Sequence, residues 1–495
     1  MMGADGRHER AVLLFGHGSA AADKPLVVMA GASGFVGQAL AGPLSLHFRV
    51  AGIARGAGPA AAPWAEWRRR DLLNLREAEE ALAGARYAVY LVHSMMPSAR
   101  LTQASFSDLD LLCADNFARA AARAGAEQIV YLGGLVPERP GMSLSSHLRS
   151  RLEVQATLAR YGVPVTTLRA GLVIGGGGSS FEILVKLVRR LPAMVCPRWT
   201  QTRMQPVAVE DVVNLLAFAV GREQLYGQTF DVGAPEALSY RELMEMCADI
   251  LDVRRPMVPV RLFTPSLSTL WVSLVTGAPR ALVGPLVESL RHEMVARDHR
   301  LSDLAGLVPT PVHDALGRAL AADGRGRPRI DPPRQKSPKA SVVRSVQRMR
   351  LPANRDAKWA AAEYARWLPI ALRRLVRVEV DAEGNIRLFL SCFRAPWIVL
   401  LLARERSTPD RQLYFFGDGL LSKKHDRGRM EFRQALDGRT LLIAIHDYSP
   451  RLPRFVYLLT QAPFHASVMG AFRRHLASMS SGEASTDVRD QAAAP

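Results

Sequence analysis

Three glycines near the start of the chain are the residues whose type and spacing best predict a chemistry. Gly31, Gly34 and Gly37 stand three positions apart, directly after the apolar run Leu26–Ala30 and at the start of a helical segment. Glycines let the backbone approach a phosphate closely, and the N-terminal N–H groups of a following helix favour an anion. The pattern predicts a dinucleotide-binding loop. The other loop residues expected to contact the cofactor are Ser33, Phe35 and Val36.

Two charged residues bear on which dinucleotide is bound. Arg55 ends the next predicted strand, 49–55, where an acidic residue would select the free 2′-hydroxyl of NAD. An arginine there can pair with the 2′-phosphate, so NADP is the predicted cofactor and NAD remains an alternative. The competing interpretation is that Arg55 is a solvated arginine at a strand end. Asp71 closes a short strand, and with Leu72 beside it we expect its carboxylate to accept from the adenine amino group.

Short apolar strands that alternate with helices must position these residues. The strands expected after the loop are 49–55, 67–71, 87–92, 128–134 and 165–169, and the helices are 109–124 and 148–161. This alternation is typical of an α/β fold with a doubly wound, parallel Rossmann sheet.

Several segments, taken together and in this order, resemble one protein superfamily. The matching segments are 30–37, 168–175, 205–213 and 229–235. They are similar to extended and atypical short-chain dehydrogenase/reductases, and the resemblance covers roughly residues 25–315. Segments 90–95 and 145–153 resemble a bacterial subgroup with an NAD(P)-binding half and a poorly characterised C-terminal domain. That subgroup is similar to NmrA-like NADP-sensing proteins and to the Rossmann-type accessory subunit of respiratory complex I.

The resemblance implies a catalytic Tyr-x-x-x-Lys pair on the helix after the fifth strand, and this chain departs from it. His147 and Arg151 occupy the best-placed positions, and the strand ends in Gly133-Gly134 where the superfamily has Ser or Thr. Histidine can act as a general acid near neutral pH, whereas arginine can hold a ribose or phosphate but does not titrate. His147 and Arg151 are therefore the candidate catalytic residues. The alternative, favoured at this point, is a pair on one helix face with no catalytic duty.

Residues at the ends of other strands complete the predicted site. His93 and Ser94 follow the fourth strand, where the loop would pass the cofactor, and Gly133 lies at the end of the fifth. We expect these residues to shape the cofactor site without reacting. Tyr131, inside the fifth strand, is interpreted as a core residue.

Charge and cysteine content bound the partners and the compartment. The net charge is +18, and residues 321–495 carry 31 Lys/Arg against 17 Asp/Glu, so most of the surplus lies in this part. Such a surplus favours peripheral contact with an anionic membrane over a specific nucleic-acid partner; solubility charge is the alternative. The four cysteines form no CxxC or Cys/His cluster, which predicts neither a metal site nor a disulfide framework. The first 24 residues lack the apolar core of a signal peptide, so we expect a cytoplasmic protein, with contact at the inner face of a membrane.

Composition divides the 495 residues into five parts. They are a flexible extension 1–24, an NAD(P)-binding domain 25–322 with substrate-side segments from about 175, a basic linker 323–358, an α+β domain 359–480 and a disordered tail 481–495. In the α+β domain the expected strands are 375–380, 386–392, 397–403, 412–416, 430–434 and 440–446, followed by a terminal helix 452–479. Together with a weak resemblance in the last helix, this order suggests a helix-grip, START-like fold.

Three functions fit these observations. The first is an NADP-dependent oxidoreductase or epimerase-like enzyme that acts on a small, apolar or amphipathic substrate. The second is a non-catalytic NADP(H)-binding sensor or scaffold protein, which would explain the replaced catalytic positions. The third concerns the C-terminal half alone, as a lipid-binding module recruited to anionic membranes. The complete cofactor frame favours the first.

Overall fold

The structure is a computed structural model, and it describes most of the chain. The described residues are 24–58, 63–93, 102–137, 143–260, 264–324, 343–373, 375–422 and 427–491. Most of the predicted N-terminal extension, the centre of the predicted linker, the end of the predicted tail and Ser94 lie outside these residues. Among the described helices, none combines the length and the apolar character needed to cross a bilayer.

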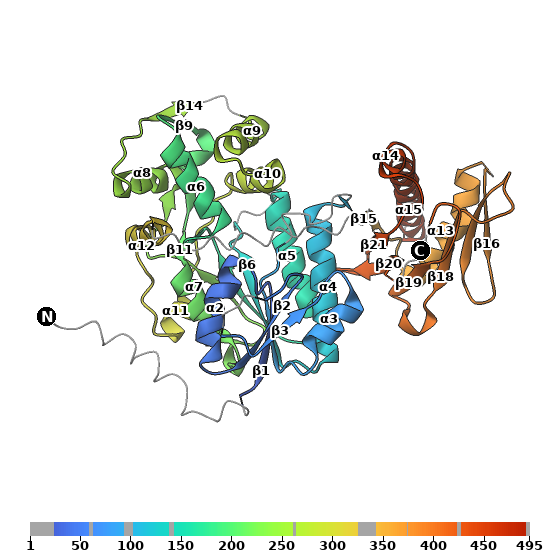
Figure 1. The fold of residues 1–495 in the computed structure, drawn as a ribbon, viewed down its shortest axis with the longest axis horizontal. Helices are drawn as coiled ribbons and strands as arrows, with labels where there is room; N and C mark the ends of the chain where they lie inside the picture. The colour runs from blue at the N-terminus through green and yellow to red at the C-terminus, as the bar shows by residue number, and fades with distance from the viewer. Residues whose placement is uncertain are drawn as a thin grey trace. The chain divides into compact units, whose positions relative to one another are not determined.

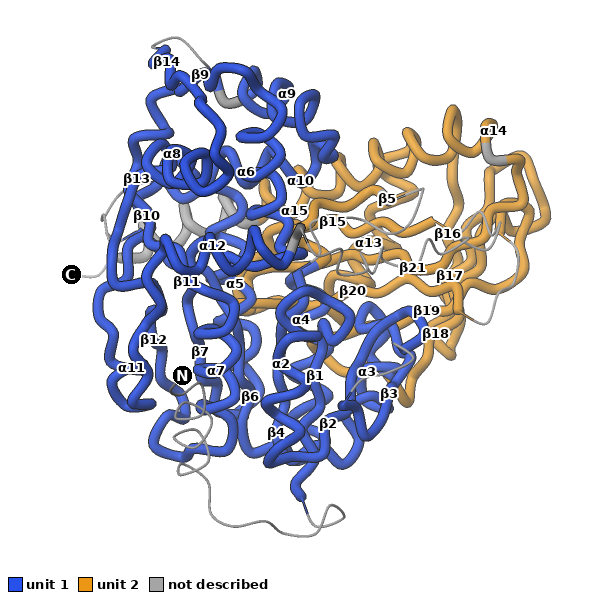
Figure 2. Tube along the Cα trace, turned by 60° about the vertical axis from the view of Figure 1, so that its left-hand side comes forward, with its two compact units in different colours: residues 1–95, 110–335 blue, residues 96–109, 336–495 orange. Residues whose placement is uncertain are grey.

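The chain forms two compact units, which Figure 2 distinguishes by colour. The first unit comprises residues 1–95 and 110–335, and the second comprises 96–109 and 336–495. Each is described by itself below.

A seven-stranded sheet forms the centre of the first unit. In chain order its strands are β1 (Leu26–Ala30), β2 (Arg49–Ala54), β3 (Glu66–Arg69), β4 (Tyr87–Tyr90), β6 (Gln128–Gly134), β7 (Val165–Ala170) and β12 (Thr229–Val232). Their spatial order is β12-β7-β6-β4-β1-β2-β3, and all neighbouring pairs are parallel. The predicted doubly wound parallel sheet is therefore confirmed.

Helices cover both faces of this sheet. They are α2 (Phe35–Ser45), α7 (Val209–Ala219), α3 (Leu75–Leu82), α4 (Phe106–Arg123) and α5 (Ser146–Leu158), with a short α11 (Arg300–Leu304). Figure 1 shows α2 and α7 on one side of the sheet and α3, α4 and α5 on the other. The buried Leu40 and Leu44 of α2 and Val212 and Leu216 of α7 share one apolar core with the strands. Burial on both faces explains why the central strands β1 and β4 are continuous apolar runs, whereas the edge strand β3 is polar.

The direction in which the chain leaves β1 fixes where a ligand can bind. From the central β1 the chain builds β2 and β3 on one side, and then β4, β6, β7 and β12 on the other. In an open parallel sheet, ligands bind beyond the carboxyl ends of the strands at this reversal of strand order. The loops after β1 and β4 flank it.

A second apolar core lies among the segments after β7. Its helices are α6 (Ser179–Arg190), α8 (Tyr240–Ile250), α9 (Pro265–Thr276), α10 (Arg280–Ser289) and α12 (Val312–Gly324). Short strand pairs accompany them: β8 (Val173–Ile174) with β11 (Val207–Ala208), β9 (Met194–Pro197) with β14 (Met257–Val260), and β10 (Arg203–Met204) with β13 (Leu238–Ser239). These elements occupy the region predicted to carry the substrate side.

The second unit is built on a largely antiparallel sheet. Its strands are β5 (Thr102–Gln103), β15 (Val343–Arg350), β16 (Val376–Val380), β17 (Ile386–Leu390), β18 (Ile398–Leu402), β19 (Arg411–Phe416), β20 (Arg429–Ala435) and β21 (Thr440–Tyr448). The spatial order is β16-β17-β18-β19-β20-β21-β15-β5, and only the short β5–β15 pair is parallel.

Two helices lie on one face of this sheet. Side chains of α13 (Ala357–Ala371) and α15 (Gln461–Gln491), among them Tyr364 and Phe472, pack with Phe432 of β20 in one apolar core, and a short α14 (Arg454–Leu459) precedes α15. β15 pairs with the last strand, β21, and the long α15 packs against the sheet, which confirms the predicted α+β domain; the helix-grip, START-like fold stays a prediction.

The predicted basic linker, 323–358, is wrong over its second half. Residues 343–350 form β15, which pairs with β21 inside the sheet, and α13 begins at Ala357. A register shift between Val343 and Ser345 interrupts the alternation that would have revealed the strand. Its arginines look like linker charges, but Arg344 pairs with Asp447 at 3.1 Å and Arg348 with Asp108 at 2.7 Å.

Three other boundaries also differ from the prediction. Residues 96–109 belong to the second unit and not to the predicted domain 25–322, because β5 pairs with β15. The predicted terminal helix is divided into α14 and α15 near Thr460, before Pro463 in the first turn of α15, where proline is tolerated. The helix also runs to Gln491, beyond the point at which disorder was predicted.

Candidate functional site

The glycine loop has the geometry that its sequence predicts. Gly31 adopts a φ of +84°, and a Cβ added to it would lie 2.9 Å from the carbonyl carbon of Leu91, in the loop after β4. A Cβ on Gly37 would overlap the carbonyl oxygen of Gly31. Glycine is therefore required at 31 by the backbone conformation and at 37 by the close approach of helix and loop.

The first turn of α2 is left open for an anion. The N–H of Gly34 donates to the Gly31 carbonyl oxygen at 2.9 Å, and the N–H of Gln38 donates to Gly34 at 3.0 Å. The N–H groups of Phe35, Val36 and Gly37 have no acceptor within the helix. No side chain caps α2 and no acidic residue lies in its first turn. The cradle and the uncapped helix end therefore fit the pyrophosphate of a dinucleotide, as predicted.

The Phe35 ring also packs against a second glycine-rich segment, a contact that was not predicted. Its ring fills the space that a side chain on Gly175 would occupy, since a Cβ there would lie 2.6 Å from the Phe35 ring. Gly178, which precedes α6, would also approach the same ring, at 3.2 Å. The run of four glycines at 175–178 was the sequence signal for this close packing.

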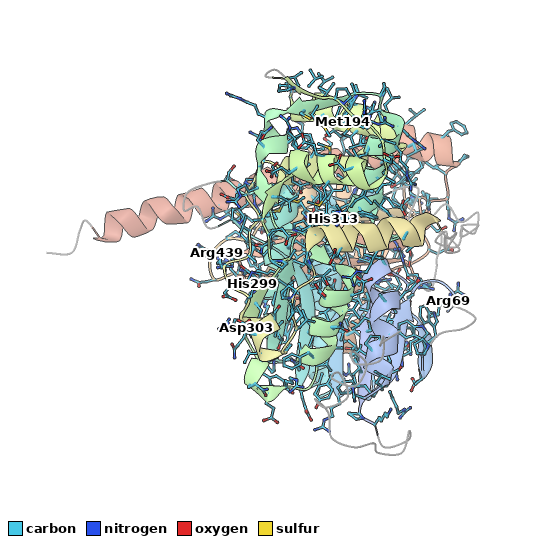
Figure 3. All side chains as sticks on the ribbon, turned by 90° about the vertical axis from the view of Figure 1, so that its left-hand side faces the viewer. Arg69, Met194, His299, Asp303, His313 and Arg439 are labelled. Atoms are coloured by element: carbon cyan, nitrogen blue, oxygen red, sulfur yellow. The ribbon has the colours of Figure 1, made fainter. Side chains whose placement is uncertain are left out.

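Arg55 follows β2 and is accompanied by a second arginine that the sequence analysis did not single out. Arg69, at the end of β3, donates through Nε to the carbonyl oxygen of Arg55 at 3.0 Å, and both side chains are exposed. Arg69 is labelled in Figure 3. The loop between the two arginines is braced by Trp67, whose Nε1 donates to the Gly56 carbonyl at 3.1 Å. Two arginines, rather than one, thus lie at the position expected for a 2′-phosphate.

The loop after β3 contains the residues predicted to lie near the adenine. Oδ1 of Asp71 accepts from the N–H of Leu73 at 3.1 Å, so this carboxylate shapes its own loop. The carbonyl oxygen of Leu72 accepts from Nδ2 of Asn116 at 2.7 Å, and Asn116 is fully buried in α4. Asn116 is a positioning residue that no local pattern in the sequence indicated.

His93 lies two residues from Leu91, in the loop after β4, and is held by a buried carboxylate. Its Nδ1 is 2.7 Å from Oδ2 of Asp110, and the Asp110 side chain is only 1% exposed. Burial and then the Arg151 guanidinium lower the pKa of His93, while the hydrogen bond with Asp110 acts in the opposite direction. Asp110 therefore orients the imidazole ring and favours a proton on Nδ1.

His147, near the start of α5, lies beside His93. The rings of His93 and His147 have centroids 4.9 Å apart, and Nδ1 of His147 is a buried atom with no hydrogen-bond partner among the described residues. Burial lowers the pKa of His147 well below its ordinary value, and His93 and Arg151 lower it further. At neutral pH His147 is thus a neutral imidazole.

Arg151, one helical turn after His147, lies over an aromatic ring. Its guanidinium carbon is 6.0 Å from the Tyr131 ring centroid, and the Tyr131 hydroxyl donates to the Arg151 carbonyl oxygen at 3.3 Å. The Nε of Arg151 is buried and has no partner among the described residues. Tyr131 lies in β6 and is fully buried, as predicted, and burial raises its pKa, so it stays protonated. Gly133 of the same strand would place a Cβ 3.2 Å from that ring.

The structure brings together residues from separate segments of the sequence. His93, His147 and Arg151 form one cluster, so the pair on α5 faces the loop after β4. Asp110 was missed because it lies 17 positions from His93 in an alanine-rich helix, where nothing local distinguishes it.

On the substrate side, a polar and aromatic loop meets α9. The indole N–H of Trp199 donates to the Ser268 hydroxyl at 3.2 Å, and the Trp199 ring lies 6.3 Å from that of Tyr240. Both segments lie in the region after residue 175 that was predicted to carry the substrate side.

No protein-family model matches the chain. One curated relative, the auxiliary protein GraX of Staphylococcus aureus, is 28% identical over 146 residues, which are 29% of this chain and 43% of that protein. The chain therefore matches less than half the length of this relative.

Several solved structures are similar to the nucleotide-binding part in fold. The NADPH-dependent quinone oxidoreductase of Escherichia coli, solved with NADPH, aligns with a TM-score of 0.48 and 16% identity, covering 59% of this chain and 99% of that one. The triphenylmethane reductase of Citrobacter sp., solved with NADP(H), aligns with 0.48 and 17% over the same shares. The UDP-glucose 4-epimerase of Thermotoga maritima aligns with 0.46 and 13%, covering 61% and 98%.

Proposed function

We propose that the first unit binds NADP(H) and reduces the carbonyl group of a small, apolar or amphipathic molecule, with His147 as the proton donor. The observation that carries this proposal is the cluster of the buried Asp110 with the partly buried His93, His147 and Arg151, beside the glycine cradle. His93 and the cradle belong to adjacent loops, since Gly31 packs on Leu91, two residues before His93.

The residues that would hold the cofactor follow from the geometry. The open N–H groups of α2 would bind the pyrophosphate, and Arg55 with Arg69 would bind the 2′-phosphate. Arg151, whose buried Nε has no partner among the described residues, would hold a ribose or phosphate oxygen. Bound there, a nicotinamide supplies the hydride.

The histidine cluster then accounts for the proton. As hydride adds to the carbonyl carbon, the π electrons of the C=O bond move to oxygen, and His147 donates a proton to that oxygen. Water returns the proton to the imidazole. His93, held by Asp110, fixes the position of His147 and is a positioning residue. Because the pKa of His147 is lowered, the rate of reduction should rise as the pH falls below 6.5.

A non-catalytic NADP(H)-binding protein is the second candidate, and a specific observation favours it. The lowered pKa values of His93 and His147 leave both rings neutral at physiological pH, so neither stands ready as an imidazolium. Under this alternative the chain binds NADPH, and no carbonyl substrate consumes it.

The variant His147→Gln separates the two candidates. With NADPH and a panel of aldehydes, ketones and quinones, we expect turnover by the native chain and a loss of about 100-fold or more in kcat for His147→Gln. The dissociation constant for NADPH, measured by its fluorescence, should be unchanged. The matched control is His313→Gln, because His313 lies on α12 with a side chain 68% exposed (Figure 3). Normal turnover by His147→Gln would refute the assignment of the acid. NADPH that binds but resists the whole panel would favour the non-catalytic alternative.

Asp110→Asn tests the positioning role of the carboxylate. Since the hydrogen bond with Asp110 raises the pKa of His93, its loss should lower that pKa and leave His93 uncharged. An uncharged His93 lowers the pKa of His147 less, so the rise in rate should begin at higher pH. A purely structural role would change stability without moving the profile.

Cofactor selectivity tests the two arginines. Replacement of Arg55 or Arg69 by alanine should weaken NADPH binding by about 10-fold or more and leave NADH binding unchanged. The control is Arg76→Ala, because the Arg76 side chain is 70% exposed and pairs with Glu80 within α3. Equal affinity of the native chain for NADH and NADPH would remove this part of the proposal.

A further inference from the structure

A cavity of about 460 Å³ lies in the second unit, and none of the proposed cofactor or catalytic residues lines it. It is formed where the end of β15, the start of β21 and one face of α15 meet. Its lining residues are Arg348, Met349, Arg350, Asp437, Arg439, Thr440, Arg473 and Ala477. Arg473 and Ala477 are four positions apart and so share a helix face.

Arginine dominates the lining, and most of its charge is uncompensated. Arg348 is paired with Asp108 at 2.7 Å. Within the described residues, no ion pair involves the side chains of Arg350, Arg439 or Arg473, and all three are exposed. These guanidinium groups come from β15, from the turn before β21 and from α15, so they converge from three separate elements.

The single carboxylate in the lining is already engaged with the backbone. Asp437 lies in the turn between β20 and β21, and its Oδ1 accepts from the N–H of Arg439 at 2.9 Å. The turn is also held by Gln434, whose Nε2 donates to the Gly438 carbonyl oxygen at 2.6 Å. Arg439, labelled in Figure 3, is therefore presented by an ordered turn.

We propose that this cavity, which we call the arginine pocket, binds a phosphate ester. Three guanidinium groups match the charge and the donor geometry that phosphate oxygens accept. The volume lies in the range of pockets for small organic ligands and exceeds what a phosphate alone would fill. The buried Met349 and the methyl group of Ala477 offer an apolar wall for the organic part.

The same chemistry could be presented by a soluble phosphate ester or by a lipid headgroup. Two measurements on the full chain distinguish the sources. Titration calorimetry with inorganic pyrophosphate reports a soluble anion. Co-sedimentation with phosphatidylcholine vesicles, with and without phosphatidate, reports a headgroup. Both are carried out without NADPH, which is itself a phosphate ester, and the variants separate the pocket from the glycine loop.

The test variants are Arg439→Gln and Arg473→Gln, and the matched control is Arg474→Gln. Arg474 is exposed on the same helix but does not line the pocket, and its replacement changes the net charge equally. Each test variant should weaken pyrophosphate binding about 10-fold and the double variant about 100-fold, whereas the control should retain native affinity. Unchanged melting temperatures would show that the variants fold.

The outcomes separate cleanly. Pyrophosphate binding that is lost only in the test variants supports a soluble ester, and phosphatidate-dependent sedimentation lost in the same variants supports a lipid headgroup. Absence of both forms of binding overturns the proposal. So does equal weakening in Arg474→Gln, which would indicate general attraction to a basic surface. None of these results depends on whether the first unit is catalytic.

Discussion

Replacement of Gly37 by alanine should abolish tight NADPH binding while the fold persists. The added Cβ would overlap the Gly31 carbonyl oxygen and lie 3.0 Å from the Cα of Ala32, where ordinary contact begins at 3.4 Å. All of these neighbours are backbone atoms, so helix and loop must move apart by at least about 0.4 Å, at a cost of about 1–3 kcal/mol. That movement displaces the N–H groups that would contact the pyrophosphate. Loss of one charge-assisted hydrogen bond costs about 1.5–3 kcal/mol, so affinity should fall about 10- to 100-fold.

A matched glycine elsewhere separates this effect from helix propensity. Gly317, inside α12, has no atom within 4 Å of the position of an added Cβ. Gly317→Ala should therefore raise the free energy of unfolding by up to about 1 kcal/mol and leave NADPH binding unchanged. Fluorescence titration gives the affinities and urea unfolding gives the stabilities. Native NADPH affinity in Gly37→Ala would refute the assignment of the cradle.

Two further predictions concern the stability of the second unit. Burial lowers the pKa of His465 to about 4, so the unfolded chain takes up a proton below pH 6.5 while the folded chain does not. The stability contributed by neutral His465 is present above pH 6.5, and about 3 kcal/mol of it is lost by pH 4. Urea unfolding should show a correspondingly smaller acid loss in His465→Asn, and an unchanged loss would contradict the assignment. On the opposite sheet face, Glu431 is buried against Arg411 and Arg433, so Glu431→Gln should cost about 3–5 kcal/mol, against less than about 1 kcal/mol for the exposed Glu379→Gln.

The first unit could be predicted from sequence because its signals are local. A strand buried on both faces is a continuous apolar run, and β6 was placed at 128–134 without error for that reason. The glycine loop could also be predicted from the sequence, because the positive φ at Gly31 and the close packing at Gly37 each require glycine.

The histidine cluster and β15 could be found only in three dimensions. Asp110 and His93 meet because α4 packs beside the loop after β4. The 17 residues between them in the sequence follow no motif that would link the two side chains. In β15 two of the arginines that suggested a linker pair with carboxylates far away in the chain, Arg344 with Asp447 and Arg348 with Asp108. Composition gives the charge of a residue but not its partner, so these long-range ion pairs could not be predicted from it.

The contact between Gly31 and Leu91 has a consequence for how this molecule can change. Because Gly31 has no side chain, the loop after β1, which is proposed to bind phosphate, lies directly against the loop after β4, which bears His93. An insertion in either loop would disturb both tasks at once. Variation is therefore tolerated best around α6, α8, α9, α10 and α12, whose apolar core is separate from that of the sheet, while the contact at Gly31 constrains both loops.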